Sequence, residues 1–463
     1  MIDTQCCHCI LYYVILICTA LYVNLLETGS LRWADNCLVV IDEVHHCLKD
    51  HPYSRLIQLC SHSQLDATRR PRLLGLTASP AGQETPEATV AMLQQLLSNL
   101  GVQRLITVER NADELALYQS TASLDIRLIT YSSSEQQLRS ELRCYLLRCY
   151  LRLCELCDSG SVRQFDALSF ISPENLEDSA SDLDVEVVQC LSDVIDTAEP
   201  KDAGNKLVVS FLSTHLKVLC QALETLDSLG QENTYNELAL LMRADYVASF
   251  LHAREAGLPC AGLESLVSGY LEAENKPVSI PDDGVIESTK RSATYIQLVT
   301  ELENWWDSRG EGGQQGMALV LVRKRSMAGV LSELLGCCAS LQKRQVSVVH
   351  IVGHGSGGAD GGMSVQLQAR TLHDIQHGKY NVIVATSVAE EGVDLPECEL
   401  VIQLDAPDCV RALVQVRGRA RKTGSRFVAF CRDAGQKSQL NSLLLQERHM
   451  TDAVKQIINS KSA

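Results

Sequence analysis

The sequence lacks any G-x-x-x-x-G-K-[ST] string, the loop whose backbone N–H groups and lysine cradle the phosphates of a nucleotide. It also lacks an excess of basic residues, because 57 acidic against 41 basic residues give a formal net charge of -16. This balance excludes a uniformly basic surface for nucleic acid, but it does not exclude a local basic patch. One such patch is the segment 411–422, which carries several arginines and no acidic residue.

No hydrophobic run has a comfortable length for a membrane span. The segment Ile10–Val23 is almost wholly apolar, but it is shorter than the roughly 20 residues that a spanning helix needs. No basic residue precedes it, as one would in a secretory signal peptide. We therefore expect a protein without a membrane segment, located in the cytoplasm.

The 19 cysteines do not have the spacing of a small disulfide-linked secreted domain. They favour free thiols in a reducing compartment. Two clusters have some likeness to zinc ligands: the cysteines around His8, and the C-x-x-C of Cys154 and Cys157. The second cluster lies in a helical pattern with no matching distant pair, so a zinc site is the less favoured interpretation.

Short apolar runs recur in two zones of the chain and are typical of buried strands in a parallel sheet. The first zone holds Leu38–Ile41 and Leu73–Leu76. The second zone holds Ala318–Val322, Val346–Val352, Val382–Ala385, Leu400–Leu404 and Phe427–Phe430. Helical stretches such as Met327–Leu335 separate these runs, and the alternation indicates an α/β fold.

The pattern between the two zones, from about Leu115 to Ala273, is mostly helical. It predicts helices at Glu135–Cys157, Asn205–Leu229 and Thr234–Glu255. The acidic, serine-rich stretch Pro173–Asp184 is typical of a solvated loop. Prolines, aspartates and a glycine at 277–284 predict a linker back into the second α/β zone.

The strongest motif is LVVIDEVHH at Leu38–His46, in which a hydrophobic strand ends in Asp42 and Glu43. Ligands of open parallel sheets bind beyond the carboxyl ends of the strands. An aspartate there can hold Mg²⁺ on a nucleotide, and a following glutamate can polarise the attacking water. Two adjacent acids alone are more often solvated, but the order D-E-V-H matches the DExH motif of superfamily-two helicases.

Two further strings follow predicted strands. GLTASP at Gly75–Pro80 leads into the hydroxyl residues Thr77 and Ser79, which in isolation would only indicate a turn. ATSVAEEGVDLP at Ala385–Pro396 places hydroxyl groups where they can donate to phosphates, and its glycine allows close backbone approach. An ordinary strand and loop is the alternative for this string.

The fourth string is QVRGRAR at Gln415–Arg421, in which Arg419 and Arg421 can reach a phosphate. Guanidinium groups fit phosphate oxygens in a bidentate manner, and an arginine finger stabilises the charge of a phosphoryl-transfer transition state. A generic basic helix start is the alternative.

The four strings have the order and approximate spacing found in superfamily-two helicases, and they resemble the Dicer and innate-immune RNA-receptor branch. Q-x-R-G-R-A-R, the ATSVAEEGVDLPEC run, LVIQLD after it and VGHG at Val352–Gly355 carry this resemblance. DHPY at Asp50–Tyr53 is similar to Dicer helicases in particular. The helical middle block corresponds, by position and helicity only, to the insertion between the two motor lobes of this branch.

The resemblance implies two RecA-like lobes, ATP and Mg²⁺ as cofactors, and double-stranded RNA as partner. Asp42 would hold Mg²⁺ through water, Glu43 would activate the hydrolytic water, and His45 would link the ATP and RNA sites. Arg419 and Arg421 would be the fingers, supported by Gln415. Double-stranded RNA is read mainly through its shape, phosphates and 2′-hydroxyls, so little sequence specificity is expected.

The remaining site residues are also implied by the resemblance. Thr77 and Ser79 would couple the ATP and RNA sites near the RNA. The nucleotide edge would be lined by Gly392 and Asp394. The residues near the RNA backbone would be His354, Gly355, Thr386 and Ser387.

The expected architecture is α/β, with a partial first RecA-like lobe, a helical insertion and a complete second RecA-like lobe. The expected boundaries are 1–18 for a non-native start, 19–112 for the remnant of lobe 1, 113–276 for the insertion, 277–436 for lobe 2 and 437–463 for a C-terminal helix. The sheet of the first lobe is expected to lack strands and to leave hydrophobic edges uncovered. No RNase III acid clusters follow Gln436, so this polypeptide is not expected to cut RNA.

Two classes of function stay open. The first is a piece of a Dicer-like, ATP-dependent RNA motor of RNA interference that cannot hydrolyse ATP alone, because the phosphate loop is absent from this sequence; an innate-immune RNA-sensing helicase is the variant of this idea. The second is an inactive module that binds double-stranded RNA or, through the helical insertion, a double-stranded-RNA-binding protein.

Overall fold

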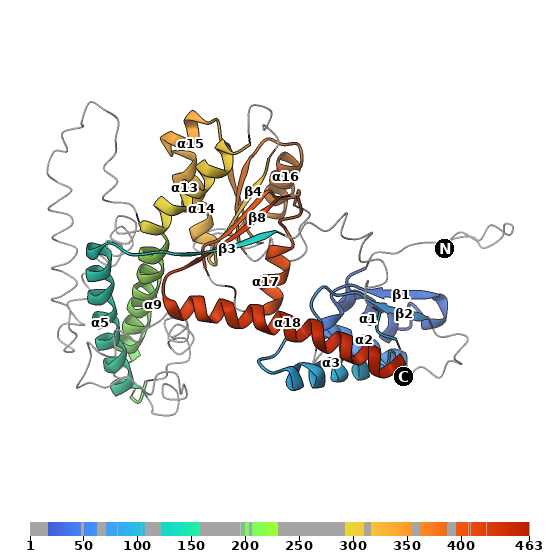
Figure 1. Cartoon of the computed structure of the whole chain (residues 1–463). Coiled ribbons are helices and arrows are strands. Elements are labelled where there is room, and N and C mark those ends of the chain that lie inside the picture. The colour runs from blue at the N-terminus through green and yellow to red at the C-terminus, as the bar shows by residue number, and fades with distance from the viewer. Residues whose placement is uncertain are drawn as a thin grey trace. The chain divides into compact units, whose positions relative to one another are not determined.

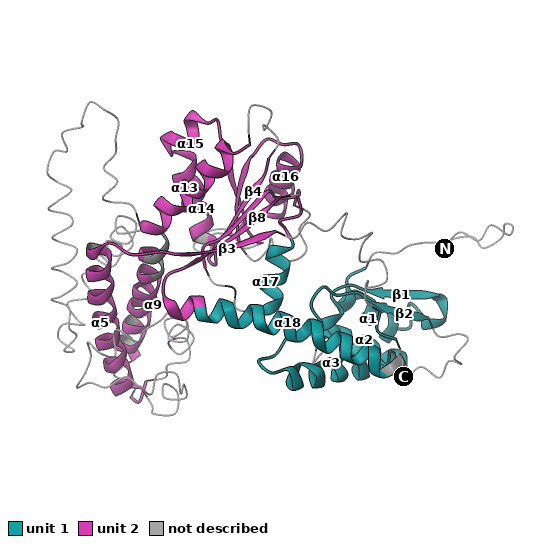
Figure 2. Cartoon of the chain, in the orientation of Figure 1, with its two compact units in different colours: residues 1–119, 407–418, 438–463 teal, residues 120–406, 419–437 magenta. Residues whose placement is uncertain are grey.

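The computed structural model places the chain in two compact units, which are coloured separately in Figure 2. The first comprises residues 1–119, 407–418 and 438–463, and the second comprises 120–406 and 419–437. The structure describes residues 17–47, 51–62, 71–80, 82–102, 104–106, 122–157, 195, 200–202, 206–229, 292–309, 316–353, 362–386, 395–405, 407, 409–422 and 424–462.

The second unit is built on a six-stranded parallel sheet with the strand order β3-β8-β7-β4-β6-β5 (Figure 1). Its strands are β3 (Ser123–Leu128), β4 (Ala318–Leu321), β5 (Val348–Ile351), β6 (Val382–Ala385), β7 (Leu400–Gln403) and β8 (Arg426–Cys431). All four residues of β4, β6 and β7 are buried, as expected for central strands covered on both faces. The α/β prediction is confirmed, and the parallel sheet fits a RecA-like helicase lobe.

The helices of this unit are α5 (Ser133–Leu156), α9 (Lys206–Leu229), α13 (Ala293–Asp307), α14 (Arg325–Gly336), α15 (Ala339–Lys343) and α16 (Val365–Gln376). Of these, α14 packs against β5 and β6, and α9 contacts α5 and α13. Serines begin α5, α13 and α16, where each N-cap hydroxyl accepts a hydrogen bond from a free amide of the first turn.

The strand β3 was not among the elements expected from the sequence. It lies within the range expected for the helical insertion, yet it pairs in parallel with β8 along its whole length. The chain therefore enters the sheet of the second unit before it forms α5. The division into domains stays a prediction at this boundary.

Leucines hold α5 and α9 together. Leu142, Leu146 and Leu153 of α5 and Leu212 and Leu216 of α9 are fully buried. Their spacing of four or seven residues places them on one face of each helix. Each such side chain contributes about 1.5–3 kcal/mol on burial, which is enough to keep this helical pair together.

One polar pair lies inside this interface, and it makes the helical pair sensitive to acid. The Tyr145 hydroxyl lies 3.1 Å from Nε2 of His215, and burial lowers the pKa of His215 from its ordinary value of 6.5 to about 4. The unfolded chain therefore binds more protons than the folded chain between pH 6.5 and 4, so stability falls as the pH falls through this window.

We expect the free energy of unfolding to decrease by about 2 kcal/mol between pH 7.5 and pH 5 because of His215. Urea unfolding followed by helical circular dichroism at both pH values would measure it. The variant His215→Leu removes the titrating group, and the difference between the two proteins isolates this contribution. An equal pH dependence in both proteins would contradict the prediction.

The first unit contains a two-stranded parallel sheet of β1 (Leu38–Ile41) and β2 (Arg72–Gly75). Its helices are α1 (Thr19–Glu27), α2 (Pro52–His62), α3 (Pro86–Leu100), α17 (Val410–Arg417) and the greater part of α18 (Ala434–Ser462). One core contains Tyr22, Trp33 and Ile41, and Ile457 of α18 packs against Leu93 of α3.

The two faces of this small sheet differ. Val39 and Ile41 of β1 belong to the core, whereas Leu38 and Val40 are 52% and 51% exposed. Leu74 of β2 is exposed on the same face, because it pairs with Val40. Parallel sheets are normally covered on both faces, whereas the described residues leave this face exposed. The expectation that the edges of this sheet are uncovered stays a prediction.

Several sequence expectations concern residues outside the described ranges. They include the apolar segment up to Leu16, the helix at Thr234–Glu255, the acidic loop at Pro173–Asp184 and the linker at 277–284. Among the residues that the structure describes, no helix is both long and apolar enough to cross a membrane.

Candidate functional site

The acidic residues of the DEVH string follow β1 directly. Asp42 is exposed, and its Oδ1 accepts a hydrogen bond of 3.0 Å from the Glu43 amide. Glu43 has the left-handed backbone angles φ 48° and ψ 46°. Such a conformation costs a non-glycine residue of order 1 kcal/mol or more and is found at functional sites. The sharp turn directs the chain from the carboxyl end of the strand into the short 3-10 helix Val44–His46.

His45 joins the DEVH string to the TAS string. The His45 side chain is buried, and its Nδ1 lies 2.8 Å from Oγ1 of Thr77 and 3.3 Å from Oε2 of Glu43. A carboxylate can only accept a hydrogen bond, so the contact with Glu43 favours the tautomer with a proton on Nδ1. The hydroxyl of Thr77 also accepts a bond of 3.2 Å from the Ser79 amide.

Backbone hydrogen bonds reinforce this connection. The Leu76 amide donates to the Ile41 carbonyl at 2.9 Å, and the Val44 amide donates to the Leu76 carbonyl at 2.9 Å. Both bonds continue the parallel pairing of β1 with β2 beyond the strands. The two motifs are therefore held in register at the carboxyl end of the sheet, where ligands of such sheets bind.

Gly75 makes this close approach possible. A Cβ atom at this position would lie 2.9 Å from both Cγ atoms of Val44, which is closer than real Cβ contacts. Val44 is buried, and its β-branched side chain has little rotational freedom. The glycine of the GLTASP string is thus needed for packing against the DEVH segment.

Ser79 contacts the C-terminal helix α18. Its side chain is buried, and its hydroxyl donates to the sulfur of Met450 in α18 at 3.4 Å. In this structure Ser79 ties the TAS turn to α18, while Thr77 contacts His45. The prediction that both residues lie near RNA stays untested.

In the second unit, Thr386 directly follows β6 and is buried. Arg419 and Arg421 lie between α17 and β8, in a segment that we name the arginine loop, Arg419–Lys422. Arg419 is half-buried and Arg421 exposed, whereas Ala420 between them is buried and anchors the loop. The partly exposed Arg419 and the exposed Arg421 are therefore carried on a segment that Ala420 anchors.

The remaining predicted residues are distributed as follows. Gln415 lies on α17 in the first unit, two residues before Arg417, whose guanidinium pairs with Glu447 of α18. The acids lie in the first unit, and the arginine loop lies in the second unit. Outside the described residues lie His354, Gly355, Ser387, Gly392 and Asp394.

Sequence reasoning missed a second acidic position, Asp405, which follows β7. Its Oδ2 accepts from the Arg323 amide at 3.0 Å, and its Oδ1 accepts from Arg432 at 2.7 Å. These bonds join the carboxyl ends of β7, β4 and β8. The signals in the sequence are an acid after a buried strand, as in the DEVH string, and its place at the end of the LVIQLD string.

The chemistry of the metal and thiol candidates is limited. Among the described residues no group of three or more histidine, cysteine or acidic side chains could hold a metal ion by itself. The exposed carboxylate of Asp42 fits Mg²⁺ that reaches the protein through one carboxylate, water and phosphate oxygens. None of the cysteines that the structure describes, including Cys154 and Cys157, forms a disulfide.

Comparison with known proteins agrees with this picture. Residues 296–424 match the family described as the helicase conserved C-terminal domain. The chain is 26% identical over 427 residues to Dicer-like protein 1 of Neurospora crassa, with 89% of this chain and 22% of the relative covered. It is 26% identical over 455 residues to Dicer-like protein 2 of Aspergillus terreus, with 94% and 29% covered.

A plant relative is similar as well: Endoribonuclease Dicer homolog 1 of Oryza sativa is 25% identical over 443 residues, with 90% of this chain and 22% of the relative covered. The chain thus spans less than a third of the length of these relatives. The helicase domain of Pyrococcus furiosus Hef has the same fold, with a TM-score of 0.53, 19% identity and coverage of 92% of this chain and 77% of that chain. In motifs, fold and sequence the chain is thus similar to Dicer-type superfamily-two helicases.

Proposed function

We propose that this chain is the part of a Dicer-like, double-stranded-RNA-dependent ATPase motor that carries the water-activating acids and the finger arginines. The observation that carries the proposal is the 2.8 Å contact between His45 and Thr77. It joins the acidic DEVH string to the TAS string through a buried side chain, so a change at one string is felt at the other. Such a connection suits a protein in which ATP hydrolysis and RNA binding depend on one another.

In this proposal each side chain has a separate task. Mg²⁺, if bound there, would neutralise negative charge on the phosphates of ATP. Asp42 holds the ion through water, and Glu43 accepts a proton from the attacking water. Arg419 and Arg421 stabilise the charge that develops on the transferred phosphoryl group, for which guanidinium groups are suited.

The phosphate loop is the part that this sequence does not contain. Without its backbone N–H groups and lysine, the acids and arginines cannot fix the β- and γ-phosphates in line with the attacking water. We therefore propose that this chain alone binds double-stranded RNA but does not hydrolyse ATP. An RNA-binding or partner-binding module without any motor role is the second candidate, and the paired helices α5 and α9 offer it a rigid surface.

Two measurements on the purified chain test this proposal. We expect its affinity for double-stranded RNA, followed by fluorescence anisotropy, to fall by at least about tenfold between 50 and 200 mM salt, because phosphate contacts release counterions. We expect ATP hydrolysis with and without RNA to stay at the background rate. Absence of RNA binding at low salt would remove the RNA-binding part of the proposal.

The role of Glu43 is tested separately. If RNA stimulates ATP hydrolysis by this chain and the activity is lost in Glu43→Gln, ATP hydrolysis needs no further phosphate loop. In a longer product of the same gene that includes such a loop, Glu43→Gln is expected to lower turnover by about 10²–10⁴-fold. Unchanged turnover in that variant would rule out Glu43 as the group that activates water.

A further inference from the structure

A stripe of side chains on α13 faces the start of two strands of the second sheet. Glu301, Trp305 and Arg309 are spaced by four residues and therefore lie on one face of the helix and its immediate end. Glu301 contacts Arg426, the first residue of β8, and Trp305 and Arg309 both contact Glu399, the residue before β7. The arginine loop lies between α17 and β8, beside these contacts.

Three of the hydrogen bonds that the structure describes join the arginine loop to Cys398, to Glu399 and to the hydroxyl of Ser425. The Cys398 amide donates to the carbonyl oxygen of Arg419 at 3.2 Å, and the buried hydroxyl of Ser425 donates to the carbonyl oxygen of Ala420 at 2.9 Å. The only one of the three that uses a charged side chain is the contact of Lys422 Nζ with Oε1 of Glu399, at 3.0 Å. Charge-assisted bonds of this kind are stronger than neutral ones.

Glu399 is itself fixed from the other side. Its Oε2 accepts from Trp305 Nε1 at 3.1 Å and from Arg309 Nε at 3.0 Å. The Arg309 guanidinium lies 5.1 Å from the ring centres of both Trp305 and Trp306, so it is also held by cation–π contacts. One carboxylate therefore bridges the helix α13 and the arginine loop.

The chain leaves space for this arrangement at Gly316, before β4. A Cβ atom there would lie 2.1 Å from Cζ of Arg309, so any larger residue would displace the guanidinium. Gly316 does not have a positive φ, so its backbone conformation does not require glycine. The structural role of this glycine is therefore to leave space for the Arg309 side chain. This is a second feature, independent of the ion pairs, that serves the same cluster.

We propose that Glu399, anchored by Trp305 and Arg309, is a positioning residue that fixes the arginine loop for phosphate contact. The proposal rests on the proposed function for the role of Arg419 and Arg421. A misplacement of about 1 Å in a charge-stabilising group can cost about 10²-fold in rate. The Ala293 amide at the start of α13 donates to Oε1 of Glu135 in α5 at 3.3 Å. This bond connects α13, and through α13 the arginine loop, to the helical pair of α5 and α9.

Hydrogen exchange of the full chain, without ATP or RNA, tests the positioning role. The Arg421 amide bonds to the Arg419 carbonyl at 3.1 Å and the Ser425 amide bonds to the Lys422 carbonyl at 2.9 Å, so both amides report on the loop. Glu399→Gln keeps an acceptor for Trp305 but removes the charge that holds Arg309 and Lys422. We expect exchange at both loop amides to rise about tenfold, with exchange in β7 and β8 unchanged.

Matched variants separate positioning from general damage. Glu303 lies on the same helix, but its carboxylate pairs with Arg344 and not with Arg309 or Lys422. Glu303→Gln should therefore leave the exchange of the loop amides unchanged. Gly316→Ala displaces Arg309 without a change of charge and should raise exchange at the loop, as should Lys422→Met. Glu399→Asp, which retains the charge, should restore part of the protection.

Unchanged loop exchange in Glu399→Gln and Lys422→Met, or an equal rise across β7, β8 and the loop, would overturn the positioning role. None of these measurements involves ATP or RNA. Failure of the proposed function would therefore appear as a lack of RNA binding or turnover, whereas failure of the positioning role would appear only in the exchange of the loop.

Discussion

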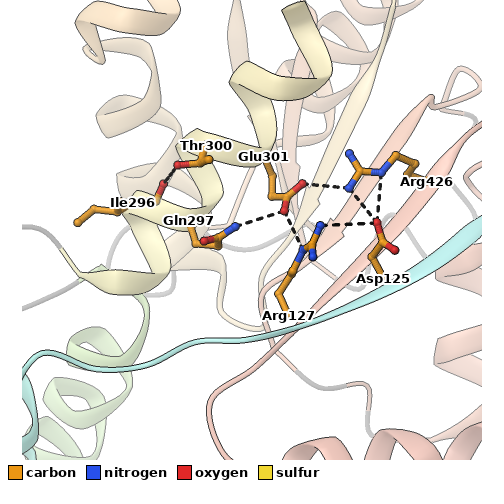
Figure 3. Close-up of polar contacts among 7 residues, drawn as sticks. All are labelled: Asp125, Arg127, Ile296, Gln297, Thr300, Glu301 and Arg426. Atoms are coloured by element: carbon orange, nitrogen blue, oxygen red, sulfur yellow. Dashed lines mark hydrogen bonds and ion pairs between the residues drawn. The ribbon is translucent and has the colours of Figure 1, made fainter. Parts of the chain in front are cut away.

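Replacing Glu301 by alanine is expected to lower the free energy of unfolding of the second unit by about 2–3 kcal/mol. Glu301 is 4% exposed, and its two carboxylate oxygens bind Arg127 of β3 at 3.0 Å and Arg426 of β8 at 3.1 Å. Figure 3 shows this carboxylate between the two guanidinium groups, with Asp125 on the far side. Loss of the carboxylate leaves two neighbouring cations with Asp125 alone.

This loss of stability is at or below the lower end of the range for breaking a fully buried ion pair. The reason is that Arg127 and Arg426 are 45% and 32% exposed, so water can partly solvate them. The edge strand β3 should suffer most, since it has a neighbour on one side only, β8. Urea unfolding followed by tryptophan fluorescence is suitable, because Trp305 and Trp306 lie on the same helix as Glu301.

Glu303→Ala is the control on the same helix. Glu303 pairs with Arg344 at 3.3 Å, but Arg344 also binds Asp307 at 2.8 Å and keeps that partner. We expect this variant to lose at most about 0.5 kcal/mol, because both side chains are partly solvated and Arg344 keeps its two bonds to Asp307. Equal destabilisation by the two variants would show that the Glu301 network has no special weight.

Much of the sheet could be predicted from the sequence, and the reason is burial. β4, β6 and β7 are fully buried runs of mostly apolar residues, and each was expected within one residue of its observed bounds. A strand covered on both faces cannot carry charge, so its run stands out. The helices α5 and α9 were likewise evident from their apolar spacing.

The strand β3 could not be predicted in this way. Asp125 and Arg127 alternate with Leu124 and Ile126, and the charges argue against a buried strand when they are considered alone. They are accommodated because the strand lies at the edge of the sheet and Glu301 and Arg426 compensate both charges. Such compensation involves residues far apart in the chain, so it becomes visible only in three dimensions.

The candidate site shows the same division. Asp42 and Glu43 could be selected because acids after a strand lie at the ligand-binding edge of a sheet. The partners of the side chains could not be selected: the bond of Ser79 to Met450 and the link of Glu399 to Lys422 each join distant segments. Residue type and spacing therefore select candidate reactive groups, whereas the groups that hold them become visible only in the structure.

Replacing Gly75 by alanine is expected to destabilise the first unit by about 1–2 kcal/mol and to disturb the DEVH segment. The new methyl group would meet Val44 at 2.9 Å, and a buried valine cannot rotate away from it. Overpacking of this kind destabilises a protein by about 1–3 kcal/mol. Replacing a flexible glycine in a strand by alanine stabilises it by about 0.5–1 kcal/mol, which partly offsets this loss. Val44 stands between Glu43 and His45, so its displacement also alters the 2.8 Å contact of His45 with Thr77.

Hydrogen exchange at the Val44 and Leu76 amides measures this effect, because both donate across the junction of β1 and β2 at 2.9 Å. We expect exchange at both amides to rise about tenfold in Gly75→Ala.

Gly329→Ala is the matched control: this glycine lies within α14, and a Cβ atom there would meet nothing within 4 Å. Alanine at that position should stabilise the second unit by about 0.5–1 kcal/mol, since it only restricts the unfolded chain and favours the helix. Opposite signs for the two substitutions are expected because contact with Val44, rather than the loss of a glycine as such, decides the result at Gly75. If Gly75→Ala leaves the exchange of both amides unchanged, the DEVH segment does not depend on this close approach.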